Sequence, residues 1–293
     1  MSIVNYIKNS TNKIRNHKQQ GFSWREYSQN ESLKEIRDFR KIIENHNIPE
    51  ILDREYIINL YKESKYYEAF AFTMMWGKIN AERPQKGYKG DKTRTPFYCA
   101  LNHGKINIEN ALIASKKELE NSNIKGAYQL FNSDYKIPGI GSSYFTKILF
   151  FQGLANNMEV MPLIYDKWTK LIHVELLVEE NEIDKLTQFY SKNQLSKLST
   201  ESANYTEMGL SIKIKRNSSN LDISIKDNFE EEAYADYVNR MNVLASNYGI
   251  KVNSLEEYLF GKELRSKKNR NKSNPRVVLL EAINKNLARL FDN

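Results

Sequence analysis

The feature that most limits the fold of this chain is a pair of glycines, Gly139 and Gly141, in a segment with the letters IPGIGS. A helical pattern over residues 125–132 precedes the segment, and an amphipathic helix follows it. Glycine permits backbone dihedrals closed to other residues and lets one backbone approach another. The pattern therefore predicts two helices joined by a tight turn, with the first amides of the second helix turned toward an anion such as a phosphodiester.

Two other structures use closely spaced glycines. Most pairs of this kind lie in simple turns, and some lie in nucleotide-binding loops. A nucleotide-binding loop follows a strand, whereas residues 127–132 indicate a helix, and the segment lacks the Gly-Lys-Ser/Thr of a phosphate-binding loop. A nucleotide-dependent enzyme stays open as an alternative; it would bind ATP or NAD without competition from DNA.

Composition limits the class of protein. The 293 residues contain 44 Lys and Arg against 36 Asp and Glu, a net charge of +8 that suits a polyanionic partner or a merely basic surface. Apolar residues make up 40%, enough for a sizeable core. The one cysteine, Cys99, excludes a disulfide framework and a cysteine-held iron–sulfur or zinc site. No apolar run is long enough to span a membrane and the first 20 residues resemble no signal peptide, so we expect a cytoplasmic protein.

The chain indicates mostly helices. Residues 1–30 are polar with an aromatic cluster, and a helix is expected from Asp53, in a stretch that stays apolar until Gly77. Residues 82–96 are basic and rich in turn formers, and residues 106–121 and 125–132 indicate two helices.

The pattern changes after residue 210. Alternating apolar and polar residues over 210–226, around the turn letters NSSN, predict a β-hairpin insert. Helical spacing returns between Tyr234 and Gly249. Ser254 with Glu257 indicates a capping box for the next helix, and Asn274-Pro275 indicates the start of the last one.

A second informative segment, residues 161–168, has the letters MPLIYDKW. It places one acid, Asp166, in an apolar and aromatic setting 25 residues after Gly141. Taken alone, Asp166 is best interpreted as the N-cap of a helix that starts at Lys167.

Taken together, the two segments resemble the helix–hairpin–helix–Gly/Pro–Asp superfamily of DNA glycosylases, and more narrowly the bacterial proteins with the 8-oxoguanine DNA glycosylase fold. The strong resemblance covers about residues 125–170. It implies a mainly α, two-lobed fold: one helical lobe over residues 30–150, ending in the helix–hairpin–helix motif, and a second over residues 1–29 plus 151–293 that carries Asp166 and the β-hairpin insert.

The resemblance also implies roles for individual residues. The hairpin of the superfamily binds a DNA phosphate, often with a monovalent cation on its turn carbonyls. Here that role falls to Gly139, Ile140, Gly141 and Ser142. The carboxylate of the second segment, here Asp166, is the catalytic group.

One position departs from the members with lyase activity. They carry a lysine two residues after the second glycine, whose amine forms a Schiff base with the sugar. Here that position is Ser143, which cannot form one, so a monofunctional enzyme is expected. Lys147 lies one turn further along the same helix face, where it either contacts phosphate or solvent or supplies a displaced amine.

Other side chains are candidates for binding DNA. An extrahelical base needs an aromatic wall, for which Trp76, Tyr144, Tyr165 and Trp168 are available, although each is more often a core residue. His103 and His173 lack metal-ligand spacing, and we expect both to be structural. A basic run near the C-terminus, which includes Lys268 and Arg270, and the loop cations Lys86, Lys89, Lys92 and Arg94 could follow phosphates.

The function expected is excision of a damaged or modified base from double-stranded DNA by Asp-assisted hydrolysis of the N-glycosidic bond, which leaves an abasic site. No metal or cofactor is expected, apart from a monovalent cation at the hairpin turn, and no protein partner is specified. Oxidised guanine and a modified phage pyrimidine are both open as substrates, in base-excision repair or antiphage defence. The alternative is a non-catalytic helix–hairpin–helix protein that only binds DNA.

Overall fold

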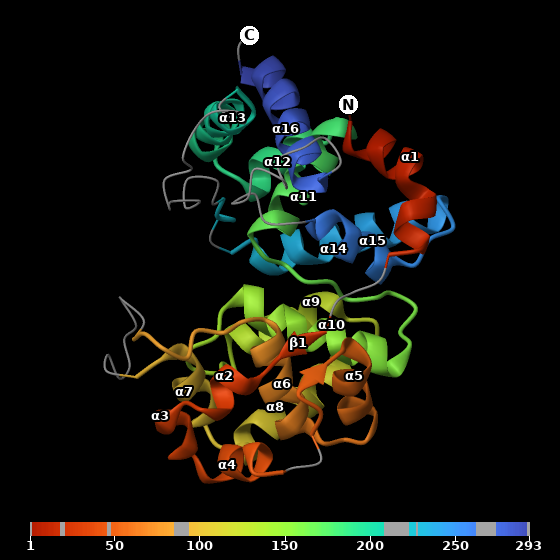
Figure 1. Ribbon diagram of the computed structural model, residues 1–293. Coiled ribbons are helices and arrows are strands. Elements are labelled where there is room, and N and C mark those ends of the chain that lie inside the picture. The colour runs from red at the N-terminus through yellow and green to blue at the C-terminus, as the bar shows by residue number, and fades with distance from the viewer. Residues whose placement is uncertain are drawn as a thin grey trace. The chain divides into compact units, whose positions relative to one another are not determined.

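The computed structural model describes residues 2–17, 21–45, 48–84, 94–207, 223–226, 228–261 and 274–291. This part of the chain is mainly helical, as predicted, and none of its helices is long and apolar enough to cross a membrane (Figure 1). It forms two compact units: residues 18–164, here called the hairpin unit, and residues 1–17 with 165–293, here called the aspartate unit.

The hairpin unit is built around helix α10, which is buried along most of its length and packs against α5, α6, α8 and α9. A helix that is apolar on all sides occupies the centre of a fold, because no face of it suits water. The elements of this unit are β1 (Phe22–Ser23), α2 (Arg25–Ser28), α3 (Glu31–Lys34), α4 (Arg37–Ile43), β2 (Ile51–Leu52), α5 (Arg54–Lys62), α6 (Tyr66–Trp76), α7 (Pro96–Leu101), α8 (Lys105–Glu120), α9 (Ile124–Asn132) and α10 (Ser142–Asn156).

The aspartate unit has α11 in the corresponding role, since α11 is buried at Thr169 and from Leu171 to Leu177 and packs against α1, α12 and α16. The most extensive helix–helix packing in this unit is between α13 and α16. Its elements are α1 (Ile3–Arg15), α11 (Lys167–Glu179), α12 (Ile183–Phe189), α13 (Lys192–Glu207), α14 (Glu230–Asn247), α15 (Val252–Phe260) and α16 (Pro275–Phe291).

The boundaries of the units differ from residues 30 and 150. Residues 21–29 lie in the hairpin unit because their aromatic side chains pack there: the ring of Trp24 meets Phe72 edge-on, with 5.9 Å between centroids, and Tyr27 meets Phe97 at 5.5 Å. The same segment supplies strand β1, which pairs antiparallel with β2, an element that the sequence did not indicate. At the other boundary, α10 continues to Asn156.

Several expected elements are confirmed and others are wrong. Asp53 caps α5 by accepting from the Tyr56 amide at 2.9 Å, but the helix stops at Lys62 and a new one begins at Tyr66, since Ser64 has φ +57°. Helices α8 and α9 match the two expected helices, and α16 begins at Pro275 as expected. The capping box of Ser254 and Glu257 is wrong, because α15 already begins at Val252 and has no side-chain cap.

The expected β-hairpin insert at 210–226 lies mostly outside the described residues. Its described part, residues 223–226, has no strand. Ile223 and Ile225 are buried there, and the Lys226 amide donates to the Phe189 carbonyl oxygen at 2.8 Å.

The aspartate unit contains a buried acid that affects its stability. Glu175 of α11 is fully buried, and its Oε1 accepts from Asn286 Nδ2 of α16 at 2.6 Å. Burial, and then the neighbouring Glu179 carboxyl, raise the pKa of Glu175 to about 9. Glu179 itself accepts from the amides of Ile3 and Val4 at the start of α1.

The first prediction follows from that raised pKa. Because Glu175 keeps its proton in the folded protein and loses it near pH 4.5 when unfolded, the stability it contributes is complete below that pH and is lost as pH rises toward 9. Glutamine at position 175 cannot ionise. Between pH 6 and pH 9 the Tm of Glu175→Gln should therefore fall by roughly 5 °C less than the Tm of the wild type falls.

Thermal unfolding followed by circular dichroism at several pH values measures this difference. Glu179→Gln is a second, informative variant: it weakens an acceptor of the α1 amides, so it should lower Tm at every pH. Because the Glu179 carboxyl also helps to raise the pKa of Glu175, this variant should in addition show a smaller loss of Tm with rising pH than the wild type. Parallel pH curves for the wild type and Glu175→Gln would contradict the prediction.

Candidate DNA-binding and catalytic residues

The two hairpin glycines have different structural roles. Gly139 has φ +83°, and a Cβ there would lie 2.2 Å from the Pro96 carbonyl oxygen, so both the dihedral and the close approach require glycine. Gly141 is extended, and a Cβ on it would meet no atom within 4 Å. The fold therefore does not need glycine at position 141, and the space beside it is open to an approaching ligand.

The start of α10 offers unpaired amides. Gly141 is its N-cap and provides no side-chain cap, while its carbonyl accepts from the amides of Tyr144 at 2.9 Å and Phe145 at 3.1 Å. Among the described residues, no acceptor is present for the amides of Ser142 and Ser143. The first turn also carries no acid. Free amides and the positive end of the helix dipole together favour an anion.

Ser143 and Lys147 come together on one face of α10, as their spacing predicts. The side chain of Lys147 is 9% exposed, and its Nζ donates to the Ser143 carbonyl oxygen and lies 5.1 Å from the centroid of the Tyr144 ring. Gly77 makes room for it, since a Cβ there would lie 2.8 Å from Lys147 Cδ. The amine thus lies against the first turn of the helix and does not extend into solvent.

Asp166 is both the N-cap of α11 and a group with a free oxygen. Its Oδ1 accepts from the amides of Trp168 at 2.8 Å and Thr169 at 3.2 Å, and its own amide donates to Thr169 Oγ1 at 2.7 Å, which completes a capping box. Its Oδ2 accepts no hydrogen bond from the described residues. Asp166 is half-buried, so a second partner can reach that oxygen.

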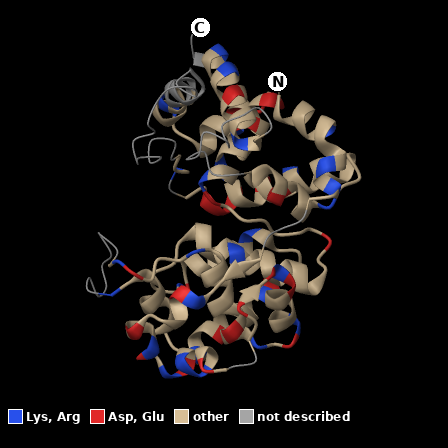
Figure 2. Ribbon diagram, viewed as in Figure 1, with Lys and Arg blue, Asp and Glu red and all other residues tan. Residues whose placement is uncertain are grey.

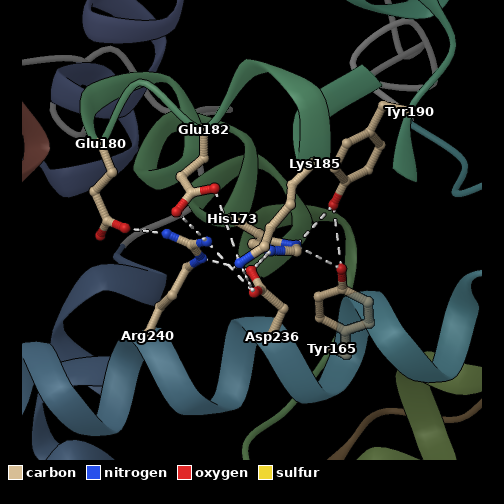
Figure 3. A network of polar contacts seen from close by, with 8 residues as sticks. All are labelled: Tyr165, His173, Glu180, Glu182, Lys185, Tyr190, Asp236 and Arg240. Atoms are coloured by element: carbon tan, nitrogen blue, oxygen red, sulfur yellow. Dashed lines mark hydrogen bonds and ion pairs between the residues drawn. The ribbon is translucent and has the colours of Figure 1, made fainter. Parts of the chain in front are cut away.

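Tyr165, the residue before Asp166, is held in place by hydrogen bonds in the core of the aspartate unit. The hydroxyl of Tyr165 lies 2.9 Å from His173 Nδ1 and 3.1 Å from the Tyr190 hydroxyl, which is itself 3.0 Å from the same nitrogen (Figure 3). All three side chains are fully buried. His173 is a structural residue in this sense, as expected, because it holds both tyrosines.

The far side of His173 meets a charged cluster. Its Nε2 lies 3.0 Å from Asp236 Oδ2, and Asp236 also pairs with Arg240 and Lys185 (Figure 3). Burial lowers the pKa of His173, whereas the hydrogen bonds from His173 and Arg240 outweigh burial and lower the pKa of Asp236. A neutral histidine that donates from Nε2 to a carboxylate leaves Nδ1 as the acceptor for a tyrosine hydroxyl.

An arginine lies against Trp168. The guanidinium carbon of Arg276 lies 4.3 Å from the centroid of the Trp168 ring and 4.7 Å from that of Phe260, and its Nε donates to the Phe260 carbonyl oxygen at 2.6 Å. Such contacts fix the indole beside the Asp166 cap. The other aromatic candidate, Trp76, packs edge-on against Phe151 with Arg54 over its face, in the hairpin unit.

Most of the expected basic contacts lie outside the described residues: Lys86, Lys89, Lys92, Lys268 and Arg270. Arg94 is described, and it pairs with Glu35 at 3.3 Å and lies over the Tyr98 ring. Across the described helices Lys and Arg are interspersed with Asp and Glu (Figure 2). In the same part of the chain no group of three His, Cys, Asp or Glu residues could hold a metal ion.

Sequence reasoning missed the residues that surround Tyr165. Asp236 and Tyr237 lie on α14, more than 60 residues beyond His173, and no local motif connects them to it. The glycines and the acid were recognisable because each acts within a few residues of its own helix terminus.

A comparison with protein-family models identifies the family of this chain. Residues 15–260 match the model of a family described as putative 8-oxoguanine DNA glycosylase OGG-like protein. Searches of curated proteins and of solved structures gave no match. Because the match spans most of the sequence and includes both the hairpin and Asp166, the chain belongs to this OGG-like family.

Proposed function

We propose that the protein is a DNA glycosylase that flips a damaged or modified base out of the duplex and hydrolyses its N-glycosidic bond. The proposal depends mainly on the Asp166 carboxylate, because its Oδ1 caps α11 while its Oδ2 can interact with a substrate. The free amides at the start of α10 and the membership of the OGG-like family support the same activity.

Each group has a distinct role. The amides of Ser142 and Ser143, with the open space at Gly141, bind a DNA phosphate, and the turn carbonyls can hold a monovalent cation. Breaking the N-glycosidic bond develops positive charge on the sugar, as in glycoside hydrolysis. Asp166 stabilises that charge and accepts a proton from the attacking water.

The proposed enzyme is monofunctional. Ser143 stands where the superfamily members with lyase activity have a lysine, and the amine of Lys147 is engaged by the Ser143 carbonyl oxygen. Water is then the nucleophile, and the product is an abasic site. The family description makes oxidised guanine the first substrate to test, in a panel that also contains modified phage pyrimidines.

The second prediction concerns Asp166→Asn. Asparagine keeps the cap, since its Oδ1 can still accept from the two amides, but it cannot stabilise the cationic sugar or take a proton. Base release in single-turnover assays should fall by at least about 100-fold, while DNA binding and Tm stay close to the wild type. Mass spectrometry of bases released from the panel measures the effect.

Asp53→Asn is the matched control, because Asp53 caps α5 by the same kind of bond to Tyr56 and should tolerate the change with full activity. If the wild type binds DNA but releases no base from any substrate, the protein is a non-catalytic DNA-binding protein instead.

The third prediction tests the monofunctional assignment. Because water is the proposed nucleophile, borohydride should trap no covalent complex between the wild type and lesion-bearing DNA, and strand cleavage should require added alkali. A trapped complex that disappears in Lys147→Ala would show that Lys147 is a nucleophile and that the assignment is incorrect.

The fourth prediction separates the two glycines. Gly141→Ala should lower Tm by at most a few degrees, because alanine is a poorer N-cap than glycine, but it should weaken DNA binding by roughly tenfold or more, the equivalent of one lost hydrogen bond to a charged group. Gly139→Ala should instead lower the free energy of unfolding by about 1–3 kcal/mol or more, because of the positive φ and the clash with Pro96. Fluorescence anisotropy and thermal unfolding distinguish the two; equal affinity of Gly141→Ala and the wild type would exclude the proposed phosphate site.

A further inference from the structure

Gly77, the C-cap of α6, is a glycine that its own backbone conformation does not require. Its φ of −72° and ψ of 0° suit any residue. A Cβ there would instead lie 2.8 Å from Lys147 Cδ and 3.2 Å from Lys147 Cε, closer than the roughly 3.5 Å at which carbon atoms make favourable contact. Glycine at position 77 therefore leaves space for a side chain of the neighbouring helix α10.

Lys147 brings a positive charge into this space. Its side chain is buried, and its Nζ donates to the Ser143 carbonyl oxygen and lies 5.1 Å from the centroid of the Tyr144 ring. An ammonium group that leaves water loses its hydration, whereas an apolar side chain of similar length would fill the same space without that loss. Packing alone therefore does not account for a lysine at this position.

The ammonium lies at the end of α10 where a cation is least favourable. Helix side chains lean toward the N-terminus, so that of Lys147 reaches back one turn to Ser143. Ser143 also supplies one of the two amides at the start of α10 that have no acceptor among the described residues, and the first turn carries no acid. Two positive groups, the helix terminus and the ammonium, thus lie together, and a bound anion would stabilise both.

We propose that Lys147 strengthens the phosphate site at the start of α10 through its charge, without contacting the DNA itself. This inference rests on the DNA-binding part of the proposed function and adds a residue to that site. The carbonyl that holds the ammonium and the amide that meets the phosphate belong to the same residue, Ser143. Two unit charges roughly 10 Å apart near a protein surface attract each other strongly enough to change an affinity by about tenfold.

The first test is Lys147→Met. Methionine fills the space beside Gly77 without a charge, so Tm should be unchanged or higher. The Kd for a duplex that carries one tetrahydrofuran abasic-site analogue, measured by fluorescence anisotropy, should rise by about tenfold. Equal affinities of Lys147→Met and the wild type would overturn the proposal.

The salt dependence separates a buried charge from a direct contact. A buried charge is screened by salt only weakly, so the ratio of the two Kd values should stay nearly constant between about 50 and 200 mM salt. A lysine that contacts a phosphate directly would release a counterion, and the ratio would then fall by about threefold over the same range. A fall of that size would overturn the proposal.

A neutralised phosphate identifies where the charge acts. In a series of duplexes, each with one methylphosphonate in place of a phosphate near the analogue, one linkage should weaken binding by the wild type most. On that duplex the Kd of Lys147→Met should come within about twofold of the wild-type Kd, while the ratio of about tenfold remains on the others. An equal ratio on every duplex, or a series in which no linkage stands out, would overturn the proposal.

Gly77→Ala keeps the charge and moves it. The new methyl group should displace the Lys147 side chain and raise Kd by roughly threefold or more. In the Lys147→Met background the same change should add no further loss, because no charge remains to be moved. An equal loss in both backgrounds would show that alanine acts on helix packing, and wild-type affinity of Gly77→Ala would show that the position of the ammonium is irrelevant; either result would overturn the proposal.

Lys116→Met on α8 is the matched control, because the Lys116 ammonium pairs with Glu120 at 3.1 Å and the variant loses the same net charge. It should change Kd by less than about twofold on every duplex. A wild type that binds DNA but releases no base would overturn the excision function alone, whereas an active wild type with an equally tight Lys147→Met would overturn only the role of Lys147.

Discussion

Asp166 caps α11 with only one of its two carboxylate oxygens, and the proposed site depends on this cap. A cap that used both carboxylate oxygens would leave nothing for a substrate, and an uncapped aspartate would lack a fixed orientation. Here the amides of Trp168 and Thr169 hold Oδ1, and the Thr169 side chain holds the Asp166 amide. The helix therefore orients the carboxylate, and its dipole favours the negative charge that the proposed catalysis requires.

The buried network of Tyr165, His173 and Tyr190 fixes the backbone next to Asp166 from the core side. Tyr165 enters the core directly before the exposed end of Asp166, and its hydroxyl is tied to His173 and Tyr190. A neutral His173 accepts on one side and donates to Asp236 on the other, so the network has a fixed direction as well as fixed positions. Buried polar groups that are fully paired in this way specify one arrangement of the core.

The sequence predicted those parts of the protein in which the signal is local. The glycine pair, the cap at Asp53 and the Asn274-Pro275 helix start all depend on residues within one turn of a helix end, and the structure has each of them. Helix α1 was missed, although Ile3, Ile7 and Ile14 share its buried face, because the polar residues between them dominate the composition. The break at Ser64 and the pairing of β1 with β2 depend on tertiary contacts, which leave no periodic signal.

The same distinction explains the candidate site. Asp166 was at once an ordinary helix cap and a catalytic candidate, and the structure makes these interpretations compatible because they use different oxygens. A group that catalysis needs is poorly satisfied in the free protein, because its partner is the substrate or the water that reacts with it. In the proposed mechanism the capped Oδ1 fixes the carboxylate and Oδ2 is the atom that the substrate meets, so one aspartate serves both the fold and the chemistry.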